Sequence, residues 1–427
     1  MSLLNMSKAD PRKRIVDHSW DFRGQNTKSY THGLHTYPAM MIPQIAGRLI
    51  DLYGGSAKRI LDPFVGSGTV LVESKLRKHL RTAIGVDLNP LALLISKAKT
   101  TPLKSSTLLQ AHTELLEKCM EDAQNTQSKT GVEIPNFPNI DFWFKPDVKT
   151  ALTILRNQIL KISDENVKNF FLVTFSETVR RVSNTRSGEF KLYRIPEEKL
   201  RHHNPNVFET FRKKSVANIG AMNDFSSKAT SCEIQVLGGD SRDLSRISDE
   251  KMDLIVTSPP YGDSRTTVAY GQFSRLALQW LGFENDMVKR MDKESLGGRP
   301  ALSHEHELGS ATLLEILERI KEKDELRARD VLSFYVDFNN CVLEIDRVCK
   351  PGALLCFVVG NRTVKEVQIP TDLIIAELFQ NRGYTHHQTI VRSIPSKRMP
   401  KKNSPTNEKG KLVSTMNEEY IIILQKK

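Results

Sequence analysis

The sequence predicts an α/β protein built on a doubly wound, mostly parallel sheet of seven strands that carries a mainly helical insertion. Three observations lead to this prediction. A short strand at residues 59–62 runs into a glycine loop and then into a helix. A second strand, residues 82–87, ends on an acid, and a third apolar run, residues 252–256, leads directly into the sequence TSPPYG. Strands that alternate with helical patterns are typical of parallel sheets.

The remaining elements follow in chain order. The expected strands are residues 59–62, 82–87, 233–237, 252–256, 353–359, 384–393 and 419–424. The helices expected between them are residues 43–53, 69–78, 90–99, 331–348 and 371–381. The sequence Lys-Pro-Gly punctuates the chain between the long fourth helix and the buried strand that follows it.

The alternation of strands and helices stops between residues 101 and 231. Amphipathic helical patterns in this stretch lie near residues 105–120, 148–162 and 165–181. They include no clear strand–helix–strand unit. A second irregular and charged stretch, at about residues 264–330, follows the TSPPYG sequence. We therefore expect residues 1–100 and 232–427 to form two parts of one sheet domain, and the two stretches to be insertions.

The loop after the first strand has the sequence DPFVGSGT and ends at Thr69. Gly66 and Gly68 allow a ligand to approach the backbone closely, and Ser67 and Thr69 can cap the helix that follows. A glycine loop followed by an acid at the end of the next strand, here Asp87, is how doubly wound sheets hold an adenosine ribose. The spacing matches neither the dinucleotide fingerprint nor the phosphate loop of nucleoside triphosphatases. The sequence therefore favours another adenosine-bearing ligand.

The TSPPYG sequence predicts a rigid acceptor site for an amino group. Pro259 and Pro260 fix φ and lack backbone N–H groups, so they hold the chain rigid where the strand ends. Ser258 and the carbonyl of Pro259 can then accept the hydrogens of an amino group on a planar base, while Tyr261 stacks on its ring. This arrangement directs the nitrogen lone pair toward an electrophile. The alternative is a turn that closes a surface loop, but the glycine loop upstream favours a functional site.

The composition is that of an ordinary globular protein with a basic surplus. The 427 residues are 39% hydrophobic and 26% charged, and the formal net charge is +12 with a pI of about 9.3. A surplus of this size favours a polyanionic partner. No apolar run reaches the ~18 residues needed to span a bilayer, and no secretory signal is visible. We expect a protein of the prokaryotic cytoplasm with no membrane association.

These motifs resemble those of the S-adenosylmethionine-dependent amino methyltransferases of DNA. In that family a DPFxGSGT loop binds the methionine part of the cofactor, an acid after the second strand holds the ribose, and an acid after the third strand meets the adenine. The sequence HTYPA, residues 35–39, is similar to the segment that closes over the methionine end. The residues that the resemblance implies for cofactor binding are Tyr37, Pro38, Asp62, Pro63, Phe64, Gly66, Ser67, Gly68, Thr69, Asp87, Leu88, Asp240 and Ser241.

The family's sharp motifs cover residues 30–100 and 232–261, and a weaker topological match covers residues 330–425. The resemblance implies a Rossmann-like methyltransferase sheet whose first part carries the cofactor loop and whose second part carries the SPPY motif. Residues 101–231 match none of the family's motifs. Because a cofactor fold alone cannot select a target, this helical insertion is the candidate target-recognition domain.

The first residue of the catalytic tetrapeptide indicates the target base. It is Ser in most cytosine-N4 enzymes of the family and Asp or Asn in most adenine-N6 enzymes, so Ser258, Pro259, Pro260 and Tyr261 point to cytosine N4. The resemblance implies that the cytosine is flipped out of the duplex and that its amine takes up the methyl group directly. Adenine-N6 methylation uses almost the same site and stays open. Guanine-N2 methylation of RNA is less favoured, because the long domain that usually precedes the cofactor motif in those enzymes is not seen.

The cysteines support transfer to an amino group. They lie far apart except for the last three, and no CxxC pair exists among Cys119, Cys232, Cys341, Cys349 and Cys356. We expect reduced core residues and no metal site. None of them follows a proline near the glycine loop. Methylation of cytosine carbon 5 requires a thiolate nucleophile, whereas an amino nitrogen attacks directly.

The expected partner is double-stranded DNA. The resemblance also implies a restriction-modification system, in which a cognate restriction endonuclease is a second partner. Arginine forks beside Asn, Ser and Tyr in the first insertion suit phosphate and base-edge contacts, although a solvated helix face has a similar composition. Arg265 and Tyr270, just after the catalytic motif, are candidates for the lip around a flipped base. The candidate DNA-binding residues are Arg180, Arg181, Arg186, Lys191, Arg194, Arg265, Lys397 and Arg398.

Overall fold

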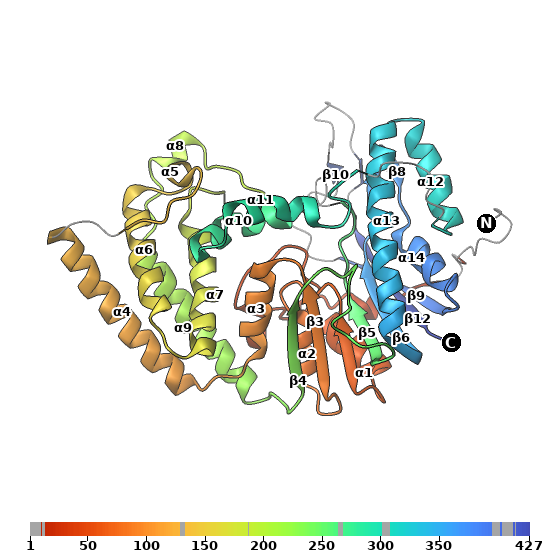
Figure 1. Ribbon diagram of the computed structural model, residues 1–427, viewed down its shortest axis with the longest axis horizontal. Helices are drawn as coiled ribbons and strands as arrows, with labels where there is room; N and C mark the ends of the chain where they lie inside the picture. Colours follow the sequence, from red (N-terminus) through yellow and green to blue (C-terminus); the bar gives the residue numbers. More distant parts are fainter. Residues whose placement is uncertain are drawn as a thin grey trace.

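Figure 1 shows the computed structural model of the protein, in which a central sheet lies between two groups of helices. The structure describes residue 10 and residues 13–128, 133–186, 188–263, 268–300, 308–394, 402–403, 413–414 and 416–427. The predicted α/β fold with a mostly parallel central sheet is confirmed.

The main sheet has eight strands in the described part of the chain, in the order β1-β9-β12-β6-β5-β2-β3-β4. Their bounds are Arg14–Val16 (β1), Arg59–Asp62 (β2), Thr82–Asp87 (β3), Glu233–Gly238 (β4), Met252–Thr257 (β5), Cys349–Val359 (β6), Thr385–Ser393 (β9) and Glu418–Gln425 (β12). Among these strands β12 alone runs antiparallel to its neighbours β6 and β9. The carboxyl ends of β2, β3, β4 and β5 therefore meet at one edge of the sheet.

The sheet thus has eight strands rather than the predicted seven, because the short strand β1 adds to its edge. Its register pairs Ile15 with Ile390 of β9 in parallel. Ile15 and Val16 remain exposed. Three residues are too few to show an alternating pattern, and this strand depends on backbone pairing with a partner far along the chain.

The remaining elements connect and cover these strands. The helices of the described residues are η3 (His18–Trp20), η4 (Tyr30–Gly33), α1 (Pro43–Tyr53), α2 (Thr69–Lys75), α3 (Pro90–Thr100), α4 (Ser105–Ser128), α5 (Ile140–Trp143), α6 (Pro146–Leu160), α7 (Glu165–Val182), α8 (Glu197–Leu200), α9 (Val207–Ser226), α10 (Tyr270–Leu281), α11 (Asn285–Glu294), α12 (Ala311–Lys321), α13 (Glu325–Val348) and α14 (Thr371–Gln380). Two small ribbons pair β7 (Thr363–Val364) with β8 (Val367–Gln368) and β10 (Lys402–Asn403) with β11 (Val413–Ser414).

Helices cover both faces of the sheet because successive side chains of a strand point to opposite faces. Ile60 of β2 joins an apolar cluster with α1 and α2, whereas its neighbour Leu61 joins a cluster with α13 and α14. Strands β5 and β6 divide their side chains between the same two clusters. Burial on both faces explains why these strands are continuous apolar runs in the sequence.

Helices α4 to α9 occupy the stretch where the strand pattern stops, and they form a group beside the sheet (Figure 1). Helices α4, α5, α6, α7 and α9 share a third apolar cluster with α3 and α10. Aromatic rings pack edge to face in this cluster, where Trp280 of α10 meets Phe137, Phe144 and Phe175. The cluster therefore joins the helical group to the sheet through α3 and α10.

The second stretch that we predicted to be irregular is largely helical. It holds α10, α11 and α12, and α13 begins at Glu325 instead of residue 331. Helix α11 buries Val288 and Met291, and its Asp292 accepts from the backbone amide of Gly271 at the start of α10. Charged residues between short apolar positions hid this amphipathic pattern in the sequence, and packing against neighbouring helices stabilises it.

One further finding concerns membranes. No helix in the described ranges is both long enough and apolar enough to cross a bilayer.

Candidate active site

A cavity lies where the carboxyl ends of β2, β3, β4 and β5 meet. Every residue predicted to bind the cofactor lies on its wall except Gly68. Of the predicted catalytic residues, Ser258 and Pro260 line the same cavity. Pro259 is buried, and Tyr261 packs against the core beside the sheet. The structure therefore brings the glycine loop and the SPPY motif to one cavity.

The glycine loop is held against α3. Gly68 is the N-cap of α2 and has a φ of +83°, a conformation that favours glycine. A Cβ atom at this position would lie 3.0 Å from the Cα atom of Ser96. The Ser96 hydroxyl donates to the carbonyl of Gly66 at 2.8 Å. Gly68 thus serves the shape of the loop without lying on the cavity wall.

Ser67 lies at the tip of this loop with its hydroxyl buried. The Ser67 Oγ atom has no hydrogen-bond partner among the described residues, and the residue lines the cavity. A buried hydroxyl without a partner costs free energy. The cavity therefore offers a polar group that a bound ligand can satisfy.

Asp87 at the end of β3 ties the second strand to the loop. Its Oδ2 atom accepts from the amide of Gly66 at 2.9 Å, and its Oδ1 atom accepts from the amide of Asn89 at 2.8 Å. Burial raises the pKa of Asp87 to about 6. Each carboxylate oxygen has a further lone pair for a ligand hydroxyl.

Asp62 at the end of β2 links the loop to the strand that precedes the SPPY motif. The hydroxyl of Thr257 donates to Asp62 Oδ1 at 2.6 Å, and the amide of Phe64 donates to the same atom at 3.1 Å. Burial raises the pKa of Asp62 to about 7, and the nearby Asp87 adds to this shift. The cavity thus holds two carboxyl groups that titrate close to neutral pH.

Asp240, after β4, is fixed by an arginine that sequence reasoning missed. The guanidinium of Arg242 donates to both carboxylate oxygens of Asp240, at 3.0 and 2.6 Å, and also pairs with Asp337 at 2.8 Å. The hydroxyl of the neighbouring Ser241 donates to the carbonyl of Pro63 in the glycine loop. Asp240 therefore presents an oriented carboxylate at the cavity.

Tyr37 and Tyr270 form one lip of the cavity. Their rings stack with centroids 5.9 Å apart and an interplanar angle of 28°. The side-chain Nδ2 of Asn89 donates to the Tyr37 hydroxyl at 3.0 Å and to the Ser274 hydroxyl at 2.7 Å. Asn89 caps α3, and the sequence Asn-Pro at a helix start is the signal that could have identified it.

Part of the wall comes from the second insertion, where we predicted no cofactor residue. Met291, Glu294 and Leu296, from α11 and the residues after it, line the cavity. The charged composition of α11 gave no indication of this contact.

The SPPY motif is held by contacts to β6 and β12. The Ser258 hydroxyl donates to the carbonyl of Val358 at 2.9 Å. Its oxygen lies 3.3 Å from the Tyr261 hydroxyl, which donates to Glu419 Oε1 at 3.2 Å. Glu419 pairs in turn with the buried guanidinium of Arg392. Burial raises the pKa of Tyr261, and the carboxylate of Glu419 adds to this shift.

A buried ion pair anchors the end of the motif. Arg362 donates to Asp263 at 2.7 Å, and the Asp263 side chain is fully buried. A Cβ atom on Gly262 would clash with this guanidinium. Glycine at position 262 therefore leaves room for the guanidinium of Arg362 beside the motif.

The predicted DNA-binding residues of the first insertion are not equally available. The guanidinium of Arg180 lies 4.2 Å above the ring of Phe273 and donates to the carbonyl of Glu189. Arg181 pairs with Glu177 at 2.9 Å and is half-exposed. Arg186 is exposed, and Lys191 is partly buried.

The last candidate of this group, Arg194, stacks 4.5 Å above the ring of Phe142 and pairs with Glu197 at 3.1 Å. Arg265, Lys397 and Arg398 lie outside the described residues. No cluster of three metal-ligating side chains occurs within the described ranges. All five cysteines are buried and free.

Comparisons with known proteins agree with these motifs. The DNA methylase family N6_N4_Mtase matches residues 4–98. The chain is 42% identical to the type II methyltransferase M.MvaI of Kocuria varians over 97% of this chain and 95% of the relative. It is 22% identical to the type II methyltransferase M.BsoBI of Geobacillus stearothermophilus over 84% of this chain and 79% of the relative. It is 20% identical to the type II methyltransferase M.MjaII of Methanocaldococcus jannaschii over 63% of this chain and 64% of the relative.

The relative from Kocuria varians matches nearly the whole length of both chains, so the likeness extends beyond the motifs to both insertions. The chain belongs to the DNA methyltransferase family.

Proposed function

We propose that this protein methylates the exocyclic N4 amine of a cytosine in double-stranded DNA, as the modification enzyme of a restriction-modification system. The observation that carries the proposal is the position of Ser258, the first residue of SPPY, on the wall of the cavity that the glycine loop also lines. A serine at this position is typical of cytosine-N4 enzymes in the family. The type II relatives support the restriction-modification context.

The residues present fit S-adenosylmethionine, which the family implies. When bound, it supplies the methyl group. Asp87 would hold the ribose hydroxyls through its remaining lone pairs, and Asp240 would meet the adenine. The unpartnered hydroxyl of Ser67 and the ring of Tyr37 would lie against the methionine part. The carboxyl groups of Asp62 and Asp87 suit a cationic ligand once they are ionised.

Ser258 would act as an acceptor for the target amine. Its own hydrogen is donated to the Val358 carbonyl, so the lone pairs of its oxygen are free to accept an amino hydrogen. The carbonyl of Pro259 would accept the second amino hydrogen. The nitrogen lone pair then points away from the motif, and alignment together with exclusion of water supplies most of the acceleration. No covalent intermediate is formed on the protein.

A base stacked inside a duplex cannot reach a cavity walled by strand ends, loops and α11. The target cytosine is therefore flipped out of the duplex before transfer. The helical insertion, residues 101–231, would supply target recognition, because the sheet domain holds the cofactor and the catalytic motif. A cognate restriction endonuclease would cut the same DNA sequence when it is unmethylated.

The test is to identify the modified base. The purified protein is incubated with methyl-labelled S-adenosylmethionine and either unmethylated bacterial DNA or transfer RNA, and the products are digested to nucleosides and separated by mass. We expect label in N4-methylcytosine from DNA, and no label with a Ser258→Ala variant. Label in N6-methyladenine would replace cytosine by adenine as the target. Label in guanosine from RNA would overturn the DNA substrate.

A further inference from the structure

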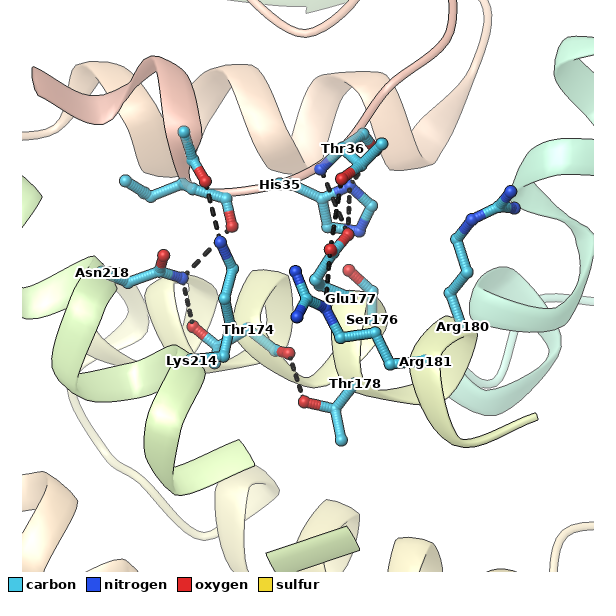
Figure 2. A network of polar contacts seen from close by, with 12 residues as sticks. His35, Thr36, Thr174, Ser176, Glu177, Thr178, Arg180, Arg181, Lys214 and Asn218 are labelled. Atoms are coloured by element: carbon cyan, nitrogen blue, oxygen red, sulfur yellow. Dashed lines mark hydrogen bonds and ion pairs between the residues drawn. The ribbon is translucent and has the colours of Figure 1, made fainter. Parts of the chain in front are cut away.

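Glu177 is a buried carboxylate on α7 that lies outside the cavity wall and has no part in the proposed chemistry. Its Oε2 atom accepts from the backbone amide of Thr36 at 3.1 Å, and its Oε1 atom accepts from the Thr36 hydroxyl at 3.2 Å. Arg181 donates to Oε1 at 2.9 Å, and His35 Nδ1 lies 3.7 Å from Oε2. Figure 2 shows Glu177 between the segment of His35 and Thr36 and the guanidinium of Arg181.

Burying a charged carboxylate costs free energy unless hydrogen bonds and opposite charges compensate for the lost water. Burial alone raises the pKa of Glu177, but His35, Arg181 and Lys214 and the amide of Thr36 bring the pKa below its ordinary value. Glu177 is therefore ionised at neutral pH. Its hydrogen bonds to Thr36 are charge-assisted, and such bonds are stronger than neutral ones.

Thr36 immediately precedes the residues that form the lip of the cavity. Tyr37, Pro38 and Ala39 line the cavity. Ala39 has a φ of +51°, a conformation that residues with a Cβ atom rarely adopt. A segment with such a backbone keeps its shape when contacts outside it hold it in place. Glu177 supplies two of these contacts at Thr36.

The same helix also supports the other side of the lip. Arg180, beside Arg181 on α7, packs on Phe273 of α10, and the Phe273 ring meets that of Tyr37 edge to face at 5.6 Å. In Figure 2 the side chain of Arg180 points away from Glu177 and toward another part of the chain. Helix α7 of the helical insertion thus contacts both the Thr36 segment and α10, from which Tyr270 stacks on Tyr37.

We propose that Glu177 is a positioning residue for the cofactor cavity: by holding Thr36, it places Tyr37 and Pro38 over the ligand and makes the lip of the cavity depend on the helical insertion. The inference rests on the proposed function, because it takes the ligand of this cavity to be the methyl donor.

The test measures binding of S-adenosylhomocysteine by calorimetry to the full chain. Glu177→Gln keeps the size of the side chain, but it loses the negative charge and one of the two acceptor oxygens. We expect the dissociation constant to rise about tenfold, which is the loss of one charge-assisted hydrogen bond. Thr36→Val removes the hydroxyl and keeps the amide, so we expect a smaller rise. Glu165→Gln, an exposed carboxylate on the first turn of the same helix, is the control and should bind as the wild type does.

Two further readouts separate positioning from general stability. The double variant Glu177→Gln/Thr36→Val should bind no more weakly than Glu177→Gln, because both changes break the same contact. In methyl transfer the KM for the cofactor should rise while kcat at saturating cofactor is retained. Additive losses in the double variant, or a fall in kcat alone, would overturn the inference.

The outcomes also separate this inference from the proposed function. If the wild-type chain binds S-adenosylhomocysteine and both single variants bind it equally well, Glu177 does not position the lip, and the proposed function stands. If the wild-type chain fails to bind it, the assignment of the cavity to the methyl donor falls, and the inference falls with it. If Glu177→Gln does not fold, Thr36→Val decides, because Thr36 is exposed.

Discussion

The hydroxyl of Tyr261 donates a hydrogen bond to Glu419 Oε1 at 3.2 Å, although the two residues are 158 positions apart in the chain. Glu419 also pairs with Arg392, whose Nε donates to the carbonyl of Trp20 at 2.8 Å. The guanidinium of Arg392 and the Trp20 side chain are both buried. The SPPY motif is thus connected through β12 and β9 to the N-terminal part of the chain.

Tyr261 is expected to act on the target base and to leave cofactor binding unchanged. Tyr261→Ala should lower kcat, because the activation free energy should rise by about 1 to 3 kcal/mol, the contribution of one base–aromatic stack. Tyr261→Phe keeps the ring and removes only the hydroxyl bonded to Glu419, so its loss should be smaller. Methyl-transfer kinetics measure the first effect and calorimetry with S-adenosylhomocysteine measures cofactor affinity. A folded Tyr261→Ala variant that no longer binds the cofactor would place the ring in the cofactor pocket instead.

Asp87 is expected to contribute to cofactor affinity through the ribose hydroxyls. Asp87→Ala should weaken binding by about 1.5 to 3 kcal/mol, as expected for hydrogen bonds to a charged group. Because Asp87 also accepts from the amides of Gly66 and Asn89, Asp87→Asn is the milder comparison, since it retains one acceptor. Calorimetry on both variants tests this, and wild-type affinity in a folded Asp87→Ala protein would contradict the assignment.

The two carboxyl groups of the cavity predict a pH dependence of binding. Burial raises the pKa of Asp62 to about 7 and that of Asp87 to about 6. Below these pKa values the carboxyl groups are protonated and neutral, and above them they are negative and attract a cation. The affinity for S-adenosylmethionine, a sulfonium cation, should therefore rise as the pH increases from about 5 to about 8.

S-adenosylhomocysteine is the matched control for this pH effect, because its sulfur is uncharged. Its affinity should rise less over the same range. Binding constants of the two ligands measured at several pH values test the difference. Identical pH profiles would show that ionisation of Asp62 and Asp87 is not coupled to the charge on sulfur.

Contacts between cationic side chains and DNA phosphates make the affinity for DNA depend on the salt concentration. Arg186 is exposed, so Arg186→Gln should weaken DNA binding and reduce the slope of log affinity against log salt by up to ~1. Arg180 and Arg181 are left unchanged, because Arg180 packs on Phe273 and Arg181 pairs with Glu177. The control is Lys228→Gln, an exposed cation that precedes β4, at the edge of the sheet away from the cavity. Equal slopes in the two variants would move DNA recognition away from Arg186.

The sequence by itself was sufficient for seven of the eight strands of the main sheet among the described residues, and for the residues at their ends. Continuous apolar runs such as β5, a glycine loop after β2 and two prolines after β5 are local signals, because they depend on the φ and ψ preferences and the burial of neighbouring residues. The parallel order of the strands then follows from their alternation with helices. For these reasons local patterns in the chain were enough to assign the cofactor loop and the SPPY motif to adjacent strand ends.

The tertiary structure alone decided which side chains meet. The pair of Thr257 and Asp62 spans 195 positions, and the bond of Glu177 to Thr36 spans 141. Which residue a side chain contacts across such a sequence distance depends on the path of the whole chain. The residues next to that side chain in the sequence do not indicate it. Packing likewise placed Arg180 on Phe273, because a guanidinium buries its planar face on an aromatic ring when a helix brings the two together.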